Sequence, residues 1–195
     1  SATLSPITSA AAPGYVGQDL TLTGTGFLPN AAITVKFGDA SIGSATSSAT
    51  GAFTVTFKVP AVAKGDHVIT VTDTTNTRTF IFVMEGNAPA APLLTLPSNI
   101  EKPKQPVVYE WGAVTDPSGV TYTLEVGNDS TFATVFMQKT GLTTTSYTAT
   151  DAEKLPTVSK DAPYYWRVIA TDGAGNVGPA STPQTFVVGF SFSDL

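Results

Sequence analysis

Few residues of this chain could carry out acid–base or nucleophilic chemistry. It has 195 residues, with a single histidine and no cysteine. Without cysteine, thiolate catalysis, disulfides and cysteine-ligated zinc are excluded. The histidine, His67, lies in Gly65-Asp66-His67-Val68, and no Gly-x-Ser-x-Gly nucleophile elbow is present. We therefore expect His67 to be a surface residue at the start of a strand and not a member of a catalytic triad.

Carboxylates are the remaining candidates for chemistry, and paired carboxylates could support glycoside hydrolysis. The candidates in the second half are Asp116, Glu125, Asp129, Asp151, Glu153, Asp161 and Asp172. No feature of the sequence brings two of them together in an apolar cleft. Asp116-Pro117-Ser118-Gly119 and Asp172-Gly173-Ala174-Gly175 are typical of turns. The sequence therefore predicts no catalytic residues.

Calcium is the one metal that remains open, because loop carboxylates of sandwich domains sometimes bind it. It takes about six to eight oxygen ligands, and no Asp-x-Asp-x-Asp cluster supplies them. Asp116 and Asp172 are the best candidates for such a site. We nevertheless predict no metal-binding residues, no cofactor-binding residues and no cofactor.

The charge balance excludes several classes of partner. The formal net charge is −5, and only 13% of the residues are charged, compared with about 25% in typical globular chains. No cluster of Lys or Arg is present, and nucleic-acid binding needs such a cluster to neutralise phosphates. Nucleic acid and anionic membrane surfaces are therefore not expected partners. No apolar run approaches the roughly 20 residues of a membrane span.

Short runs with a period of two, bounded by Gly, Pro, Asn or Asp, dominate the chain and predict β-strands. In the first half they are Leu4–Ser9, Asp19–Thr25, Ala32–Gly38, Phe53–Val59, His67–Asp73 and Arg78–Met84. In the second half they are Val107–Gly112, Thr121–Val126, Thr134–Lys139, Ser146–Thr150, Tyr164–Thr171 and Gln184–Val188. This spacing predicts an all-β chain of two tandem immunoglobulin-like β-sandwiches.

The change in composition at 85–92, with two prolines and almost no alternation, indicates a short, semi-rigid linker. We therefore predict one domain at 1–86 and a second at 87–195, the second ending in a short tail. No counterpart of the Trp111/Trp166 pair occurs in the first half. We expect two different immunoglobulin-like domains and not tandem copies.

Alternation assigns the large aromatic residues to two faces. Trp111, Trp166 and Tyr122 are in phase with apolar neighbours, which predicts a core position. Tyr165 and Arg167 lie on the opposite phase and are expected to face outward, where Arg167 could pair with Glu125 on a neighbouring strand. Lys36 and Lys58 are also expected outside, so no Lys–Asn cross-link is invoked. Asn128-Asp129-Ser130 matches the N-glycosylation pattern, which is often matched by chance.

The second half resembles a fibronectin type III domain from about 88 to 188. The matching residues are Trp111, Tyr122, Leu155-Pro156, the run from Tyr164 to Ala170, Gly175 and Ser181. Trp111 lies on the expected second strand and Tyr122 on the third. The resemblance implies that Tyr164 is the tyrosine-corner residue, with its hydroxyl bonded back to nearby backbone. The stretch from Leu124 to Phe132 is more similar to prokaryotic members. The Arg-Gly-Asp tripeptide is missing, so integrin binding is not implied.

The first half resembles an IPT/TIG domain, another immunoglobulin-like fold, from about 4 to 84. The matching residues are Pro13-Gly14, the run Leu20–Phe27 and the run Ile33–Gly38. The resemblance implies that Gly24 and Gly26 let the chain leave its strand and turn sharply, while Phe27 enters the core. Some members bind DNA, but the acidic charge argues against that activity here.

Exposed strand edges are the remaining indication of an interaction surface. Val107–Tyr109 and Phe186–Val188 are nearly continuous apolar runs at the two ends of the second domain. If either edge is open, a partner strand could add to it.

These observations predict a non-enzymatic structural, spacer or adhesion module pair. The absence of cysteine is typical of a bacterial or archaeal surface protein or of a cytosolic protein. The low-charge, Thr-rich composition favours a prokaryotic cell-surface or secreted protein. The expected partner is an unknown protein or polysaccharide, and the expected state is a monomer. Ser1 is not an initiator Met, which indicates a segment of a longer protein. The alternative is an accessory carbohydrate-binding or presenting module of a secreted enzyme. A planar exposed row formed by Tyr15, Tyr109, Tyr147 or Tyr165 would favour that alternative.

Overall fold

The computed structural model describes residues 1–156 and 163–189, and in this part the chain is almost entirely β-structure. It divides into two compact units, one containing Ser1–Asn87 and the other containing Ala88–Asp172. Each unit has its own hydrophobic core. Among the described residues, no helix has the length and apolar character of a membrane span.

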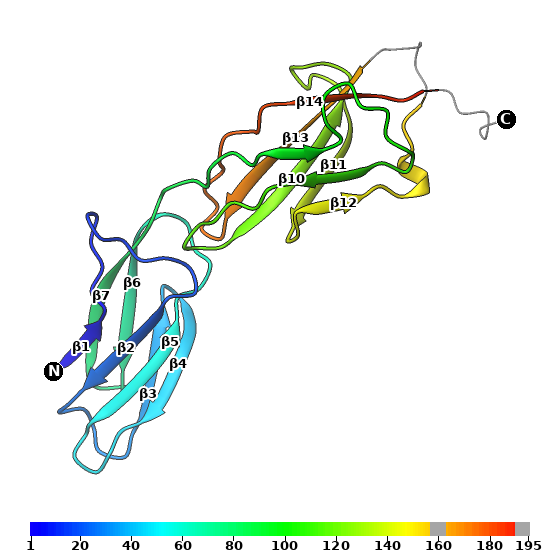
Figure 1. Ribbon diagram of the computed structural model, residues 1–195. Helices are drawn as coiled ribbons and strands as arrows, with labels where there is room; N and C mark the ends of the chain where they lie inside the picture. The colour runs from blue at the N-terminus through cyan, green and yellow to red at the C-terminus, as the bar shows by residue number, and fades with distance from the viewer. Residues whose placement is uncertain (157–162, 190–195) are drawn as a thin grey trace. The chain divides into compact units, whose positions relative to one another are not determined.

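The first unit is a sandwich of two antiparallel sheets (Figure 1). Its strands are β1 (Ala2–Ser5), β2 (Asp19–Gly24), β3 (Ala32–Phe37), β4 (Ala40–Thr46), β5 (Phe53–Lys58), β6 (Gly65–Thr72) and β7 (Thr77–Met84). One sheet has the order β1-β2-β5 and the other the order β4-β3-β6-β7. Alternate residues such as Leu20, Leu22, Ile33, Val35 and Ile69 are fully buried between the sheets, as the period-two pattern predicts.

The second unit is also a sandwich of two antiparallel sheets (Figure 1). Its strands are β8 (Leu94–Leu96), β9 (Val108–Trp111), β10 (Val120–Gly127), β11 (Val135–Leu142), β12 (Ser146–Thr148), β13 (Pro163–Asp172) and β14 (Gln184–Val187), with a 3₁₀ helix, η1 (Asp151–Glu153). The sheets have the orders β12-β9-β8 and β11-β10-β13-β14. Numbered within each unit, the strand order is the same in both. The predicted all-β fold of tandem immunoglobulin-like sandwiches is therefore confirmed.

The aromatic core of the second unit follows the predicted phase of β13. Tyr164, Trp166, Val168 and Ala170 are buried, whereas Tyr165 and Arg167 are half-buried on the other face. Trp166 Nε1 donates to the Pro97 carbonyl at 3.1 Å. The Tyr164 hydroxyl donates to the Pro156 carbonyl, which confirms the expected tyrosine corner.

The glycines after β2 have two different roles, and the expectation that both permit a turn is wrong for one of them. Gly26 has a φ of 71°, which favours glycine, and Phe27 after it is buried. Gly24 is instead the last residue of β2, paired with Phe53. A Cβ atom on Gly24 would lie 2.1 Å from the Phe53 ring. Gly24 therefore lets Phe53 pack against the strand.

Two strands and two strand edges differ from the sequence prediction. β4 and β8 were not expected, because neither has a clear apolar alternation. Val107–Tyr109 is not an open edge, since β9 lies between β8 and β12. β14 is a sheet edge, but Glu101 bridges to Phe186 and accepts the Val187 N–H at 2.9 Å. The apolar runs of the second unit are therefore not open for strand addition at these positions.

Candidate functional site

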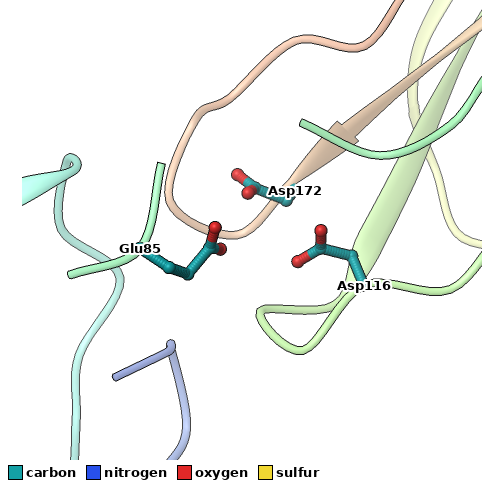
Figure 2. Close-up of side chains that lie close together, drawn as sticks. All are labelled: Glu85, Asp116 and Asp172. Carbon is teal, nitrogen blue, oxygen red and sulfur yellow. The ribbon is translucent and has the colours of Figure 1, made fainter. Parts of the chain in front are cut away.

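Asp116 and Asp172, the two carboxylates singled out from the turn motifs, come together in the second unit (Figure 2). One carboxylate oxygen from each lies within 4.8 Å of the other. Asp116 lies in the loop between β9 and β10, where it accepts the Ser118 N–H at 2.9 Å. Asp172 is the buried last residue of β13, paired with Val120. Strand pairing therefore places the two carboxylates beside each other.

This pair places two carboxylates side by side, with Asp172 buried and Asp116 half-buried. Two unit charges about 4 Å apart repel by about 1 kcal/mol in water and more at lower dielectric. Such a pair is stabilised by sharing a proton, by donors around it or by a cation. Two carboxylate oxygens fall short of the roughly six to eight ligands that calcium takes. We therefore treat Asp116 and Asp172 as a candidate cation-binding pair and not as a complete site.

The other candidate carboxylates each have a local structural role. Glu125 accepts Arg167 Nε at 3.0 Å and Arg167 Nη2 at 2.9 Å, which confirms the predicted pair. Gln138 also donates to Glu125, at 3.3 Å, and the Arg167 guanidinium lies 4.2 Å from the centre of the Phe132 ring. Glu125 is buried, so this pair is less exposed than an ordinary surface salt bridge.

Asp129 closes its own turn. Its carboxylate accepts the Thr131 N–H at 2.8 Å and the Thr131 hydroxyl, together with the N–H groups of Ala133 and Thr134. The Thr131 hydrogen bond is the main reason why the pKa of Asp129 is lowered. Asp161, another candidate from the sequence, lies outside the described residues.

Glu153 belongs to a polar cluster with Lys139 and Tyr147, which joins the two sheets of the second unit. Glu153 forms an ion pair with Lys139 of β11 and accepts the Tyr147 hydroxyl of β12 at 2.8 Å. It also accepts the Thr150 N–H at 2.9 Å. The Lys139 contact, then the Thr150 N–H, lower the pKa of Glu153 to about 2, although burial opposes them. A carboxylate held in its ionised form by three donors is suited to structure and not to acid catalysis.

His67 has the structural role expected of it. It lies near the start of β6, and its Nε2 is 2.6 Å from the Ala63 carbonyl oxygen. Its ring lies 5.6 Å from that of Phe37. The structure places no Ser–His–Asp arrangement around His67 within the described residues.

The proposed aromatic row for carbohydrate binding does not form from the predicted residues. Tyr109 is buried against Trp166, with ring centres 5.4 Å apart. The Tyr147 hydroxyl is engaged by Glu153, and Tyr15 belongs to the first unit. Of the second-unit tyrosines in this set, Tyr147 and Tyr165 are both half-buried, and the hydrogen bond to Glu153 holds only the Tyr147 hydroxyl.

Asp73 is the most heavily hydrogen-bonded carboxylate of the first unit, and sequence reasoning missed it. It is buried just after β6 and accepts the N–H groups of Leu28 (2.6 Å), Thr75 (3.0 Å) and Asn76 (2.6 Å), and the Asn76 side-chain amide at 2.8 Å. Burial raises the pKa of Asp73, but these donors outweigh it, and the pKa lies well below its usual range. The Asp73-Thr74-Thr75-Asn76 run was an available turn signal.

The solved structures that match this chain are only distantly similar to it. No protein-family model matches the sequence, and no curated protein matches it significantly. Among solved structures, the fibronectin(III)-like modules of Clostridium thermocellum CbhA match 96% of this chain and 94% of their own, at 15% identity and a TM-score of 0.40. The FN1–FN3 domains of chicken CNTN1 match 90% of this chain and 64% of their own, at 16% identity and a TM-score of 0.35. The D0–D1 domain of intimin matches 96% of this chain and 98% of its own, at 15% identity and a TM-score of 0.31. The resemblance to fibronectin type III and immunoglobulin-like domains rests on the strand order within each unit.

Proposed function

We propose that this chain is a non-enzymatic pair of structural modules that acts as a spacer or adhesion segment of a prokaryotic cell-surface or secreted protein. The observation that carries the proposal is that the carboxylates that could do chemistry are hydrogen-bonded within the fold. Glu125, Asp129 and Glu153 accept hydrogen bonds that hold strands and turns. Asp73 does the same in the first unit. Side chains committed in this way favour mechanical and packing roles over catalysis.

The surface composition agrees with this role. With 13% charged residues, much of the polar surface consists of Thr and Ser on the outer faces of the sheets. Thr3 and Thr23, for example, lie side by side on β1 and β2, with their hydroxyl oxygens 2.7 Å apart. Such hydroxyl pairs between neighbouring strands stabilise the sheet without adding charge.

The alternative, an accessory carbohydrate-binding module, depends on exposed aromatic platforms. The Tyr109 ring is buried in contact with Trp166, which removes one of the four tyrosines considered for such a platform. This contact favours the spacer or adhesion role over carbohydrate binding.

Single-molecule stretching of the chain between two handles tests the spacer role. Each unit should unfold in its own event, because each has a separate core. The two events should release similar contour lengths of roughly 300 Å, at about 3.6 Å for each residue of an extended chain. A pull-down with cellulose, chitin and xylan should show no retention above that of a Trp166→Ala control that is confirmed to be unfolded. Specific retention of the folded chain, or extension without unfolding events, would contradict the proposal.

A further inference from the structure

The edge of the first unit formed by β7 is unusually regular. β7 pairs with β6 through eight consecutive residue pairs, from Gly65↔Met84 to Thr72↔Thr77, with no register shift. It is the last strand of the sheet β4-β3-β6-β7, so its other side has no neighbouring strand of that sheet. Regular edges of this kind can pair with another chain unless they are blocked.

One end of this edge is covered by the chain itself. Gly14 donates to the Val83 carbonyl at 2.8 Å and accepts the Glu85 N–H at 2.9 Å. The Thr8 hydroxyl accepts the Val83 N–H at 2.8 Å. These contacts show that the backbone groups of Val83 point away from β6. Because the pattern alternates, the backbone groups of Thr79 and Ile81 point in the same direction.

The edge is open at Thr79 and Ile81. Within the described residues, no hydrogen bond reaches the outward backbone groups of Thr79 or Ile81. Arg78 is the one charged residue between Thr77 and Ile81, and its guanidinium donates to the Thr77 carbonyl at 2.8 Å. Bulges, prolines and charged side chains are the usual guards of an edge strand. This stretch has no bulge and no proline, and Arg78 is its single charged guard, at the Thr77 end.

Apolar side chains surround the open stretch. Ile81 is 52% exposed and lies opposite Val68, which is 44% exposed. Ile7 is 83% exposed. Ile7, Ile81, Phe80, Leu4, Thr3 and Ala2 line a cleft of about 290 Å³ between the edges of the two sheets. A strand added here would cover apolar surface as well as pair backbone groups.

We propose that the occupant of this edge is β7 of a second copy of the chain, in an antiparallel, two-fold symmetric pair centred on Thr79. In this register Thr79 faces its own equivalent, Thr77 faces Ile81 of the second copy, and Arg78 faces Phe80 of the second copy. The two four-stranded sheets would then form one continuous sheet of eight strands. This inference replaces the expectation of a monomer, and it goes beyond the proposed function, which does not require self-association.

The length and the charge of the open stretch favour a second copy. A two-fold pair centred on Thr79 uses Thr77–Ile81 of both chains and stops before Val83, where Gly14 and Thr8 occupy the edge. This register therefore avoids the covered end of both edges, and it requires the Arg78 guanidinium to leave the Thr77 carbonyl. The single cation, Arg78, meets an aromatic residue and not a like charge, although the chain as a whole is acidic.

Sedimentation velocity over a range from micromolar to millimolar concentration tests this proposal. We expect a reversible monomer–dimer equilibrium. Thr79→Pro removes an outward N–H at an edge position where proline is tolerated, and Ile81→Lys adds a guarding charge. Each should weaken dimerisation by about tenfold or more, equivalent to at least about 1.4 kcal/mol. The matched control, Leu93→Lys, changes a residue of the second unit that is 75% exposed, and it should leave the dimer unchanged. Far-UV circular dichroism confirms that every variant folds.

Cross-linking tests the register directly, because the chain has no cysteine. Facing residues of a hydrogen-bonded antiparallel pair have Cα atoms about 5.5 Å apart, within the roughly 4.4–6.8 Å range of a disulfide. Thr79→Cys should therefore give an oxidised dimer. Thr70→Cys, one strand inward on the same face, should not. A chain that remains monomeric at millimolar concentration, or equal cross-linking of the two variants, would overturn the proposal. Pairing of β7 with another protein while the chain stays monomeric would also overturn it.

Discussion

The carboxylate of Asp73 accepts the backbone N–H of Leu28 at 2.6 Å, across 45 residues of sequence. This contact attaches the loop after β2 to the end of β6. The same loop is held by Ser47, whose hydroxyl oxygen accepts the Ala31 N–H at 2.9 Å and which donates to the Leu28 carbonyl. Two side chains, each directly after a different strand, thus fix one loop of the first unit.

Replacement of Asp73 by Asn should destabilise the first unit. The new amide nitrogen would be a donor in place of Oδ2, which now accepts from Leu28 and from the Asn76 side chain. Donors would then face donors at a buried position. Urea denaturation should give a lower midpoint for Asp73→Asn than for Asp39→Asn, a control at an exposed turn. Equal midpoints would show that the network contributes nothing to stability.

The same network predicts a dependence of stability on pH. The pKa of Asp73 is lowered in the folded state, so its contribution is fully present above the unfolded pKa of about 3.9. That contribution is lost as the pH falls through the folded pKa. The free energy of unfolding of the first unit should therefore decrease with acidification below about pH 4. The decrease should be smaller in Asp73→Asn; an unchanged slope in that variant would contradict the assignment.

Disruption of the Glu153 cluster should loosen the contact between β11 and β12. Glu153→Gln removes the ion pair with Lys139 but keeps an acceptor for Tyr147 and Thr150. Because Lys139 is about one-third exposed, we expect a loss of only about 1 kcal/mol at pH 7. That difference should shrink between pH 4.5 and about 2, where Glu153 becomes protonated in the wild type. Asp151→Asn, in the exposed pair with Lys154, serves as the control and should have no measurable effect.

Strand positions were largely predictable from the sequence, whereas strand neighbours were not. Alternation of apolar residues is a local property, and it assigned Trp166 and Tyr165 to opposite faces of β13. β4 was not predicted because its Ala, Ser and Gly residues give no clear apolar alternation. β8 was not predicted because it has only three residues. Which strands form the edges depends on pairing between distant segments. For that reason β9 was mistaken for an edge and β7 was not recognised as one.

In the candidate site, too, local turns were predictable from the sequence, whereas contacts between distant segments were not. The turn motifs around Asp116 and Asp172 were visible in the sequence, but their proximity depends on the pairing of Val120 with Asp172. The Asp73 turn was also local, yet its partner Leu28 could not be inferred because the contact joins the loop after β2 to the end of β6, far apart in sequence. Glycine roles were equally ambiguous, since a strand-end glycine can permit a turn or a close contact.

The role assigned to Gly24 predicts a compensating pair of substitutions. Gly24→Ala would place a methyl group 2.1 Å from the Phe53 ring, and overpacking of this kind costs about 1–3 kcal/mol. Phe53→Leu in the same chain should recover part of that loss, because the smaller side chain leaves the space. Gly26→Ala serves as the contrast: nothing lies near its Cβ, but its φ of 71° is unfavourable for alanine. Additive effects of Gly24→Ala and Phe53→Leu in thermal denaturation would argue against the contact.

Asp116→Asn tests how the carboxylate pair of the second unit is stabilised. The Asn side-chain carbonyl can still accept the Ser118 N–H, so the turn is retained, while the negative charge beside Asp172 is removed. Removal of one of two neighbouring negative charges should make the variant more stable by up to about 1 kcal/mol in buffer with a chelator. We expect this gain because two carboxylate oxygens alone are too few for a tight calcium site. Denaturation of wild type and variant, with EDTA or with millimolar calcium, distinguishes repulsion between the carboxylates from binding of a cation. Stabilisation of the wild type alone by calcium would show instead that the pair holds a cation, with further ligands supplied around it.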